Sequence, residues 1–327
     1  MRRRRFFKVA VIAVILLLVL VFLYSGFRVL ESTVFSKEEP VVSDTTSKTI
    51  IRDEIKYFPR QDIETYLLMG IDRYGPVEDS GSYNNDGEAD AIMLLIFDKK
   101  QETVRVLALN RDTMVDMPVL GLGGRQAGTA YGQLALAHTY GSGLKDSCEN
   151  VRRTVSDLLL GIEIDHYVAM NMDGIALLND AVGGVEVEVQ DDFSQASPPI
   201  PMGKTVLRGN QALSFIRVRK GVGDQLNVSR MDRQQVYMES FLDALRVCLK
   251  QDSTFAAKLF DELSPYFVTD SSAKVFTSAM DRYGDYVLEE IVTPKGENRM
   301  GEDYLEFYAD EADLDELTLR LFFAPKK

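Results

Sequence analysis

Three charged residues stand beside short apolar runs that have the length of buried strands. The runs are residues 66–71, 91–97 and 104–109. Asp72 follows the first run, Asp90 precedes the second and Arg111 follows the third. Only six residues join the second and third runs, too few for a crossover helix, so these two strands form a hairpin. If the first loop also returns without a helix, the three charged ends meet at one edge of a sheet. Two carboxylates and a guanidinium gathered there are typical of an active site rather than of a core.

A basic cluster lies further along the chain and consists of Arg217, Arg219, Lys220, Arg230 and Arg233. Arg230, Arg233 and Gln234 are spaced i, i+3 and i+4, so they share one face of a predicted helix near its N-terminus. Guanidinium groups at that position suit an anion with several oxygens, such as pyrophosphate. The alternative is a solvated basic face that pairs with the surrounding acids.

Composition excludes several classes of function. The formal net charge is −13, which argues against non-specific binding of nucleic acid because such binding needs clustered Lys and Arg. His138 and His166 are the only histidines, which excludes a zinc site built from several of them. Cys148 and Cys248 are too far apart in sequence for a metal knuckle. They are either small buried side chains or a disulfide.

The N-terminus predicts a membrane anchor. Arg2 to Arg5 and Lys8 precede a charge-free stretch, residues 9–27. As a helix this stretch spans about 28 Å, which matches the core of a bilayer. A cleaved secretory signal is the alternative, but its apolar part is normally shorter and ends at small residues. The preceding cations stay in the cytoplasm, so either reading places the rest of the chain outside it.

The remaining sequence alternates strand and helix signals and predicts an α/β fold with a mixed central sheet flanked by helices. The predicted helices are residues 145–160, 173–181, 211–216 and 230–250, and two further strands are 166–170 and 185–189. Residues 28–60 are too polar to pack and are predicted to be a linker.

Seven motifs occur in an order that resembles the LytR-CpsA-Psr family. They are LLMGID (67–72), ADAIMLL (89–95), VLALNRDT (106–113), GIEIDHYVAMNMDG (161–174), AVGGVEV (181–187), LRGNQALSFIRVRK (207–220) and SRMDRQQ (229–235). The resemblance implies an α/β/α sandwich. The chain would then divide into a cytoplasmic segment (1–8), a transmembrane signal-anchor (9–27), a linker (28–60), a catalytic domain (61–250) and an acidic C-terminal part packed on it or continuing it (251–327).

The resemblance also implies an activity and its partners. Such a protein is an extracytoplasmic phosphotransferase of the bacterial cell membrane. It moves a glycopolymer, such as teichoic acid or capsule, from a polyprenyl-pyrophosphate carrier to a peptidoglycan hydroxyl and forms a phosphodiester. The carrier's tail needs an apolar tunnel, which we expect between the sheet and the helices after Lys145 and Arg230.

The motif positions carry the implied roles. Asp72 and Asp90 would hold Mg²⁺ or a similar ion such as Mn²⁺, because hard cations prefer carboxylate oxygens. Pyrophosphate oxygens would be bound by a set of five residues: Arg111, Arg217, Arg219, Arg230 and Gln234. Asp90, Arg111, Arg219 and Arg230 are the candidate catalytic residues, and Asp90 could instead, or also, accept the proton of the acceptor hydroxyl.

Two other functions stay open. The same site could hydrolyse polyprenyl pyrophosphate with water as acceptor. The chain could also be a non-catalytic binder of lipid or glycan in wall assembly, because Asn227 stands where many family members have an acidic residue.

Overall fold

The computed structural model describes residues 49–52, 54–218, 222–223, 227–302 and 304–325. The predicted cytoplasmic segment and the predicted anchor lie outside these residues. Within the described ranges, no helix combines the length and the apolar character needed to cross a membrane. Residues from Ile51 onward form one compact unit.

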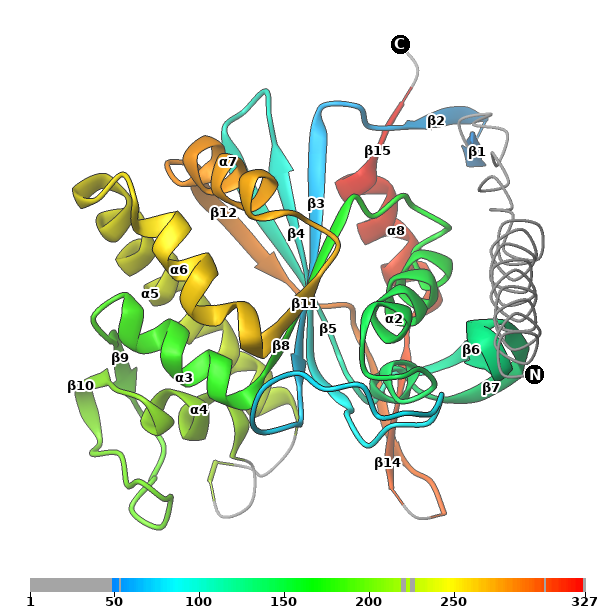
Figure 1. Ribbon diagram of the computed structural model, residues 1–327. Coiled ribbons are helices and arrows are strands. Elements are labelled where there is room, and N and C mark those ends of the chain that lie inside the picture. The colour runs from blue at the N-terminus through cyan, green and yellow to red at the C-terminus, as the bar shows by residue number, and fades with distance from the viewer. Residues whose placement is uncertain (1–48, 53, 219–221, 224–226, 303, 326–327) are drawn as a thin grey trace, which may run out of the picture. The chain divides into compact units, whose positions relative to one another are not determined.

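A six-stranded mixed sheet forms the middle of this unit (Figure 1). In spatial order its strands are β11 (Phe267–Thr269), β8 (His166–Asn171), β3 (Ile63–Ile71), β4 (Ala89–Asp98), β5 (Thr103–Leu109) and β12 (Val287–Val292). β4 is antiparallel to β3 and to β5, and β8 is parallel to β3. These pairings confirm the predicted hairpin of β4 and β5. They also confirm that β4 runs opposite to β3. The apolar run of β4 is continuous because helices cover both faces of the sheet.

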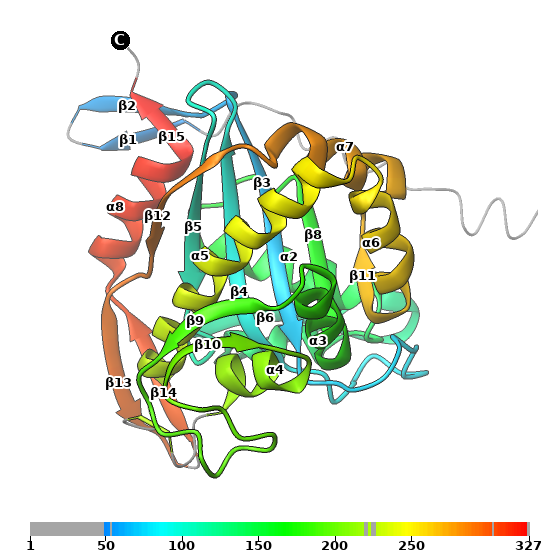
Figure 2. The same cartoon turned by 90° about the vertical axis from the view of Figure 1, so that its left-hand side faces the viewer.

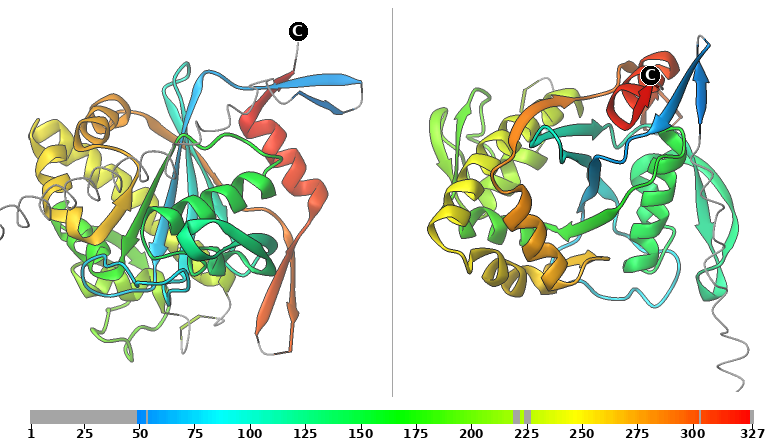
Figure 3. Two further views of the ribbon diagram at one scale, coloured as in Figure 1. Left: turned by 45° about the vertical axis from the view of Figure 1, so that its right-hand side comes forward. Right: turned by 90° about the horizontal axis from the view of Figure 1, so that it is seen from above.

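Helices lie on both sides of the sheet, as the predicted fold class requires (Figures 1 and 3). One side carries α3 (Met172–Ala181), α4 (Asn210–Arg217), α5 (Asn227–Gln251), α6 (Phe255–Leu263) and α7 (Ala273–Tyr283). The other side carries α2 (Lys145–Leu158) and α8 (Glu311–Phe322). Cys148 on α2 and Cys248 on α5 are free thiols, and the first of them is fully buried.

Smaller strand pairs complete the fold (Figure 2). They are β6 (Met114–Leu120) with β7 (Gln126–Gln133), β9 (Val185–Val189) with β10 (Gly203–Leu207), and β13 (Gly296–Met300) with β14 (Leu305–Ala309). Three short 3₁₀ turns are Leu122–Gly124, Leu134–His138 and Ser264–Tyr266. β9 alternates buried and exposed residues as predicted. Gly184 precedes it with φ 88°, where a Cβ atom would lie 2.8 Å from the Leu207 carbonyl oxygen.

The predicted linker ends earlier than residue 60. β1 (Ile50–Arg52) and β2 (Ile55–Pro59) are strands, and β2 pairs with β15 (Phe323–Pro325) near the other end of the chain. A pairing partner more than 260 positions away leaves no local signal in a polar segment, which is why composition alone predicted a linker. The acidic C-terminal part also supplies both edge strands of the central sheet, β11 and β12.

Candidate active site

The three strand ends meet at one edge of the sheet, as predicted. Arg111 follows β5 and is only 9% exposed. Its Nη2 lies 2.5 Å from Glu88 Oε2, its Nη1 forms an ion pair with Asp90, and its Nε is 3.3 Å from Asp112 Oδ1. Three carboxylates therefore surround one guanidinium. Such a fork fixes their geometry more tightly than a lysine could.

Arg217 brings the later half of the chain to this edge. It ends α4, and its Nη2 lies 2.6 Å from Asp72 Oδ1 while its Nε lies 4.0 Å from Asp90 Oδ2. Its Nη1 donates to the hydroxyl of Tyr74 at 3.0 Å. One guanidinium thus joins both predicted aspartates. Asp72 and Arg217 are each 35% exposed at the side chain, so this part of the edge faces solvent.

Helix α5 adds Arg230 and Gln234 from its first turns. The Arg230 side chain is 2% exposed, and its Nη2 donates to the Asp90 carbonyl oxygen at 3.3 Å. Gln234 Nε2 donates to the Ile216 carbonyl oxygen at 3.1 Å, which ties α5 to the end of α4. We call the set Asp72, Asp90, Arg111, Arg217 and Arg230 the charged cluster. Arg219, also predicted to be part of the site, lies outside the described residues.

Arg233 belongs to the basic cluster in sequence but not to the charged cluster in space. Its Nε donates to the Phe215 carbonyl oxygen at 2.9 Å, and its Nη2 donates to the Val218 carbonyl oxygen. Its Nη1 lies 3.1 Å from Asp191 Oδ2. Arg233 is 7% exposed and thus holds the C-terminal turn of α4, the turn that carries Arg217.

An apolar cavity of about 300 Å³ begins beside the charged cluster, between the sheet and α5, α6 and α7. Gly70, Ala91 and Gln234 line the end nearest to Asp72 and Asp90, and Tyr66 and Tyr283 line the opposite end. The expectation that the helix after Lys145 also lines this space is wrong. That helix, α2, contributes none of the lining residues because it packs on the other face of the sheet. An apolar helix face predicts burial but not which sheet face it covers.

A model of the LytR_cpsA_psr family matches residues 26–322. The chain belongs to this family. TagU of Halalkalibacterium halodurans, named a polyisoprenyl-teichoic acid–peptidoglycan teichoic acid transferase, is 30% identical over 223 residues, which are 68% of this chain and 64% of that protein. TagU of Oceanobacillus iheyensis, with the same name, is 27% identical over 278 residues, 82% of this chain and 79% of that protein. The chain spans 64%, 52% and 56% of the length of three curated relatives that it matches.

The crystal structure of B. subtilis TagV has the same fold as this LytR_cpsA_psr family member. The TM-score is 0.61 at 22% sequence identity, and the match covers 80% of this chain and 96% of that one.

Two residues that contact the charged cluster were not predicted from the sequence. Glu88 lies two residues before Asp90, and strand alternation could have placed both on one face. Tyr74 could not have been found, because it reaches Arg217 only through the fold of the loop after β3. Asp112 is buried and accepts a hydrogen bond from Gln133 Nε2 at 3.1 Å, so it supports the neighbouring strands.

The carboxylates at this edge fit a divalent cation that is shared with a substrate. In the described part of the chain, no group of three or more His, Cys, Asp or Glu side chains could hold a metal ion with protein ligands alone. Asp72 and Asp90 contact the same guanidinium, so their oxygens lie close together. Mg²⁺ is commonly bound by one or two carboxylates and completed by substrate phosphates. Two carboxylates suffice for that arrangement.

Proposed function

We propose that this protein is a membrane-anchored extracytoplasmic phosphotransferase that moves a glycopolymer from a polyprenyl-pyrophosphate carrier to a peptidoglycan hydroxyl. One observation carries the proposal: guanidinium groups gather beside one end of an apolar cavity, where Gly70, Ala91 and Gln234 line it. A ligand that fills both regions must join an anionic head to a long hydrocarbon tail. The family and the names of its TagU relatives agree with that chemistry.

The arginines neutralise the pyrophosphate. Phosphoryl transfer depends mainly on positioning and on stabilising charge on the phosphate oxygens. Arg111, Arg217 and Arg230 bind these oxygens from three different elements, with Arg219 as a fourth and Gln234 as a neutral donor. In the free protein these guanidinium groups contact carboxylates. When the anion binds, phosphate oxygens take the place of those carboxylates.

The transfer forms one P–O bond and breaks one P–O bond, so it needs neither an oxidant nor a third reactant. The acceptor hydroxyl attacks the phosphorus that carries the glycopolymer, and a new P–O bond forms. The bond to the bridging oxygen breaks, and polyprenyl phosphate leaves. We assign the hydroxyl proton to the Asp90 carboxylate. Asp72 and Asp90 are also the residues that would hold Mg²⁺ or Mn²⁺, which supplies positive charge at the pyrophosphate oxygens when bound.

The location follows from the N-terminal sequence. Residues 9–27 form the anchor, residues 1–8 stay in the cytoplasm, and everything after the anchor lies outside the cell membrane. A protease added to intact spheroplasts should digest the C-terminal part and spare a tag at residue 1.

The test uses the full chain in detergent micelles with Mg²⁺, a lipid-pyrophosphate glycan donor and peptidoglycan oligomers. We expect a product joined by a phosphodiester, and its loss in Asp90→Ala and in Arg219→Ala. Arg208→Ala is the matched control, because this exposed arginine lies outside the charged cluster and should leave turnover unchanged. Equal turnover by the wild type and both site variants would refute the assignment.

Hydrolysis is the second candidate, and the exposure of Asp72 and Arg217 to solvent favours it. Product analysis with and without peptidoglycan oligomers separates the two functions. Release of glycopolymer phosphate at the same rate in both samples, with no ligated product, identifies a hydrolase.

A further inference from the structure

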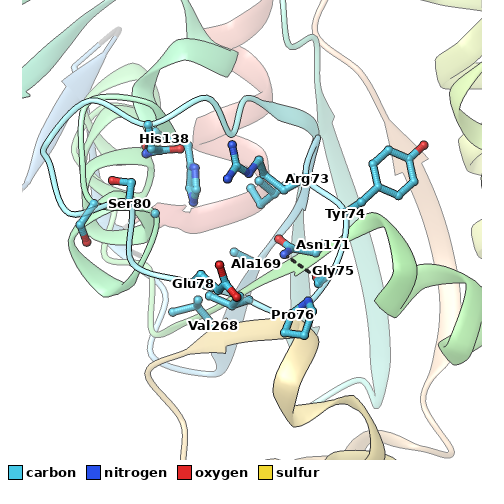
Figure 4. Close-up of a pocket in the computed structure, with 15 residues that line it drawn as sticks. Arg73, Tyr74, Gly75, Pro76, Glu78, Ser80, His138, Ala169, Asn171 and Val268 are labelled. Carbon is cyan, nitrogen blue, oxygen red and sulfur yellow. Dashed lines mark hydrogen bonds between the residues drawn. The ribbon is translucent and has the colours of Figure 1, made fainter.

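A second cavity, of about 130 Å³, is lined by Ala169 of β8 (Figure 4). Its neighbours Val168 and Met170 line the apolar cavity, so the two cavities lie on opposite faces of the sheet. The floor of the second cavity is buried and includes Ile71, Ala169 and His138. Its rim is the exposed loop after β3, which contributes Arg73, Tyr74, Pro76, Glu78 and Ser80. We call this space the His138 pocket, or simply the pocket. The proposed function does not use it.

His138 gives the pocket a buried hydrogen-bond acceptor. The side chain is 2% exposed, and Nδ1 lies 2.7 Å from the Gly87 carbonyl oxygen. A carbonyl oxygen can only accept, so Nδ1 carries the proton and Nε2 is a bare acceptor. Nε2 is buried and has no hydrogen-bond partner among the described residues. Burial lowers the pKa of His138 to about 4, so the ring is neutral at pH 7.

The other walls supply a donor and apolar contacts. The Arg73 guanidinium is about half exposed and, among the described residues, pairs with the exposed Asp86, 3.4 Å away. Such surface pairs contribute little free energy, so the guanidinium can turn to another acceptor at small cost. Ile71, Ala169 and Val268 belong to the apolar part of the lining, together with Pro76 and Val77.

A small amide fits these three features together. Its N–H would donate to His138 Nε2, its carbonyl oxygen would accept from Arg73, and its methyl group would pack on the apolar residues. A cavity of about 150 Å³ holds benzene, so a space slightly smaller has room for the four heavy atoms of an acetamido group. An anion fits poorly because His138 is neutral and Glu78 stands at the rim.

The pocket and the charged cluster share the same two chain segments. Gly87, which holds His138, precedes Glu88, which contacts Arg111. On β3 and just beyond it, Ile71 and Arg73 line the pocket while Asp72 between them contacts Arg217. Tyr74 lines the rim, and its hydroxyl accepts from Arg217. A group held in the pocket therefore lies one residue away from the charged cluster.

Resting on the proposed function, we propose that this pocket binds the acetamido group of an N-acetylated amino sugar in the acceptor glycan. The pocket then sets which acceptor is used and places its hydroxyl against the charged cluster.

The experiment measures binding of three probes to the full chain in detergent micelles, at a salt concentration that screens the positive charge of the amine form. The probes are one amino-sugar oligomer with N-acetyl groups, the same oligomer with N-butanoyl groups, and the free-amine form. We expect the N-acetyl oligomer to bind about tenfold more tightly than the other two, which corresponds to one well-placed hydrogen bond and its packing. Calorimetry without donor lipid gives this result independently of any transfer reaction.

Two variants and a matched control complete the test. His138→Phe removes the acceptor, and Val268→Phe fills the apolar side, so each should abolish the preference for N-acetyl groups. His166→Phe changes the only other histidine, which contacts Ser271 and lies outside the pocket lining, and should keep the preference. Thermal unfolding checks that each variant is folded.

Equal binding of the three oligomers to the wild type would overturn the inference, and so would an unchanged preference in both pocket variants. Those outcomes mean that the pocket holds water only. Formation of the phosphodiester product in the same preparations would show that the proposed function survives that failure. Selective binding without product would show the reverse.

Discussion

The guanidinium groups of Arg111 and Arg217 each contact several oxygens from different residues. Arg217 contacts Asp72 and Asp90 and donates to the hydroxyl of Tyr74. Its guanidinium carbon, Cζ, lies 5.8 Å from the centre of the Tyr74 ring. A planar fork with five donors can satisfy these contacts together, whereas an ammonium group acts as a point charge. Replacing arginine by lysine here therefore changes geometry while keeping charge.

We expect Arg217→Ala to lower kcat/KM about 100-fold, which is typical for the loss of one donor that stabilises developing charge. Arg217→Lys should recover only part of this loss, because lysine cannot hold Asp72 and Tyr74 at once. Steady-state kinetics with the lipid donor measures both effects. Arg208→Lys is the control. Wild-type kinetics in Arg217→Lys would mean that charge alone matters at this position.

At this scale, the sequence motifs named Asp72, Asp90, Arg111, Arg217, Arg230 and Gln234, and the structure brings all six together. Glu88 and Tyr74 were missed. Both lie in the long polar loop after β3 or at its end, where no periodic pattern indicates which side chains turn inward. Arg217 and Arg233 carry the same charge, and both belong to the basic cluster of the sequence. Only their tertiary contacts show that Arg217 lies in the charged cluster and Arg233 does not.

Between elements, the junction of α4 and α5 decides where Arg217 lies. Arg233 donates to two carbonyl oxygens at the end of α4 and pairs with Asp191, which precedes β10. Carbonyl groups at a helix C-terminus have no partner inside the helix, so an outside donor stabilises that end. The first turns of α5 therefore fix the last turn of α4.

Removing this donor should cost about 3 kcal/mol of stability, as expected when one partner of a buried ion pair is lost. Arg233→Ala should also raise KM for the lipid donor, because Arg217 is no longer held. Urea unfolding measures the first effect and steady-state kinetics the second. Lys250→Ala is the control on the same helix: it loses an ion pair with Asp285 (2.8 Å) and lies outside the lining of the apolar cavity, so it should leave KM unchanged. The same KM in both variants would leave Arg233 with a purely structural role.

The apolar cavity can be narrowed from α5 without touching the charged cluster. Met238 lines the cavity, and Val236 on the same helix is 41% exposed outside it. Met238→Trp should raise KM for a long-tailed donor at least tenfold and leave binding of inorganic pyrophosphate unchanged. Val236→Trp should alter neither quantity. An unchanged KM in Met238→Trp would exclude the cavity as the tail site.

Strands and long helices were largely predictable because their apolar runs and periodicity are local. The sheet face that each helix covers was not, and for this reason α2 was assigned to the wrong side. Long-range pairings, such as β2 with β15, also leave no local pattern.

Across the whole molecule, burial of an imidazole links stability to pH. The pKa of His138 is lowered to about 4 by burial, against the effect of the Gly87 carbonyl and Asp146, which raise it. The ordinary pKa of a histidine is 6.5, so between pH 6.5 and 4 the unfolded chain binds the proton that the folded chain does not. Stability falls through that window as the pH falls, by up to about 3 kcal/mol from this group.

We expect urea unfolding of His138→Gln at pH 7, 5.5 and 4.5 to show a shallower loss than the wild type. The free energy of unfolding of His138→Gln should therefore rise relative to that of the wild type as the pH falls. Parallel curves would mean that His138 titrates normally in the folded state.

The alternation of β3 has a kinetic consequence. Tyr66 and Gly70 both line the apolar cavity and are four residues apart, so the cavity follows the strand for about 13 Å. The opposite face of the same strand bounds the pocket that contains His138. A donor lipid and an acceptor sugar that approach from opposite faces do not obstruct one another, and neither must depart before the other arrives. Both should be bound at once, so double-reciprocal plots at several acceptor concentrations should intersect rather than run parallel.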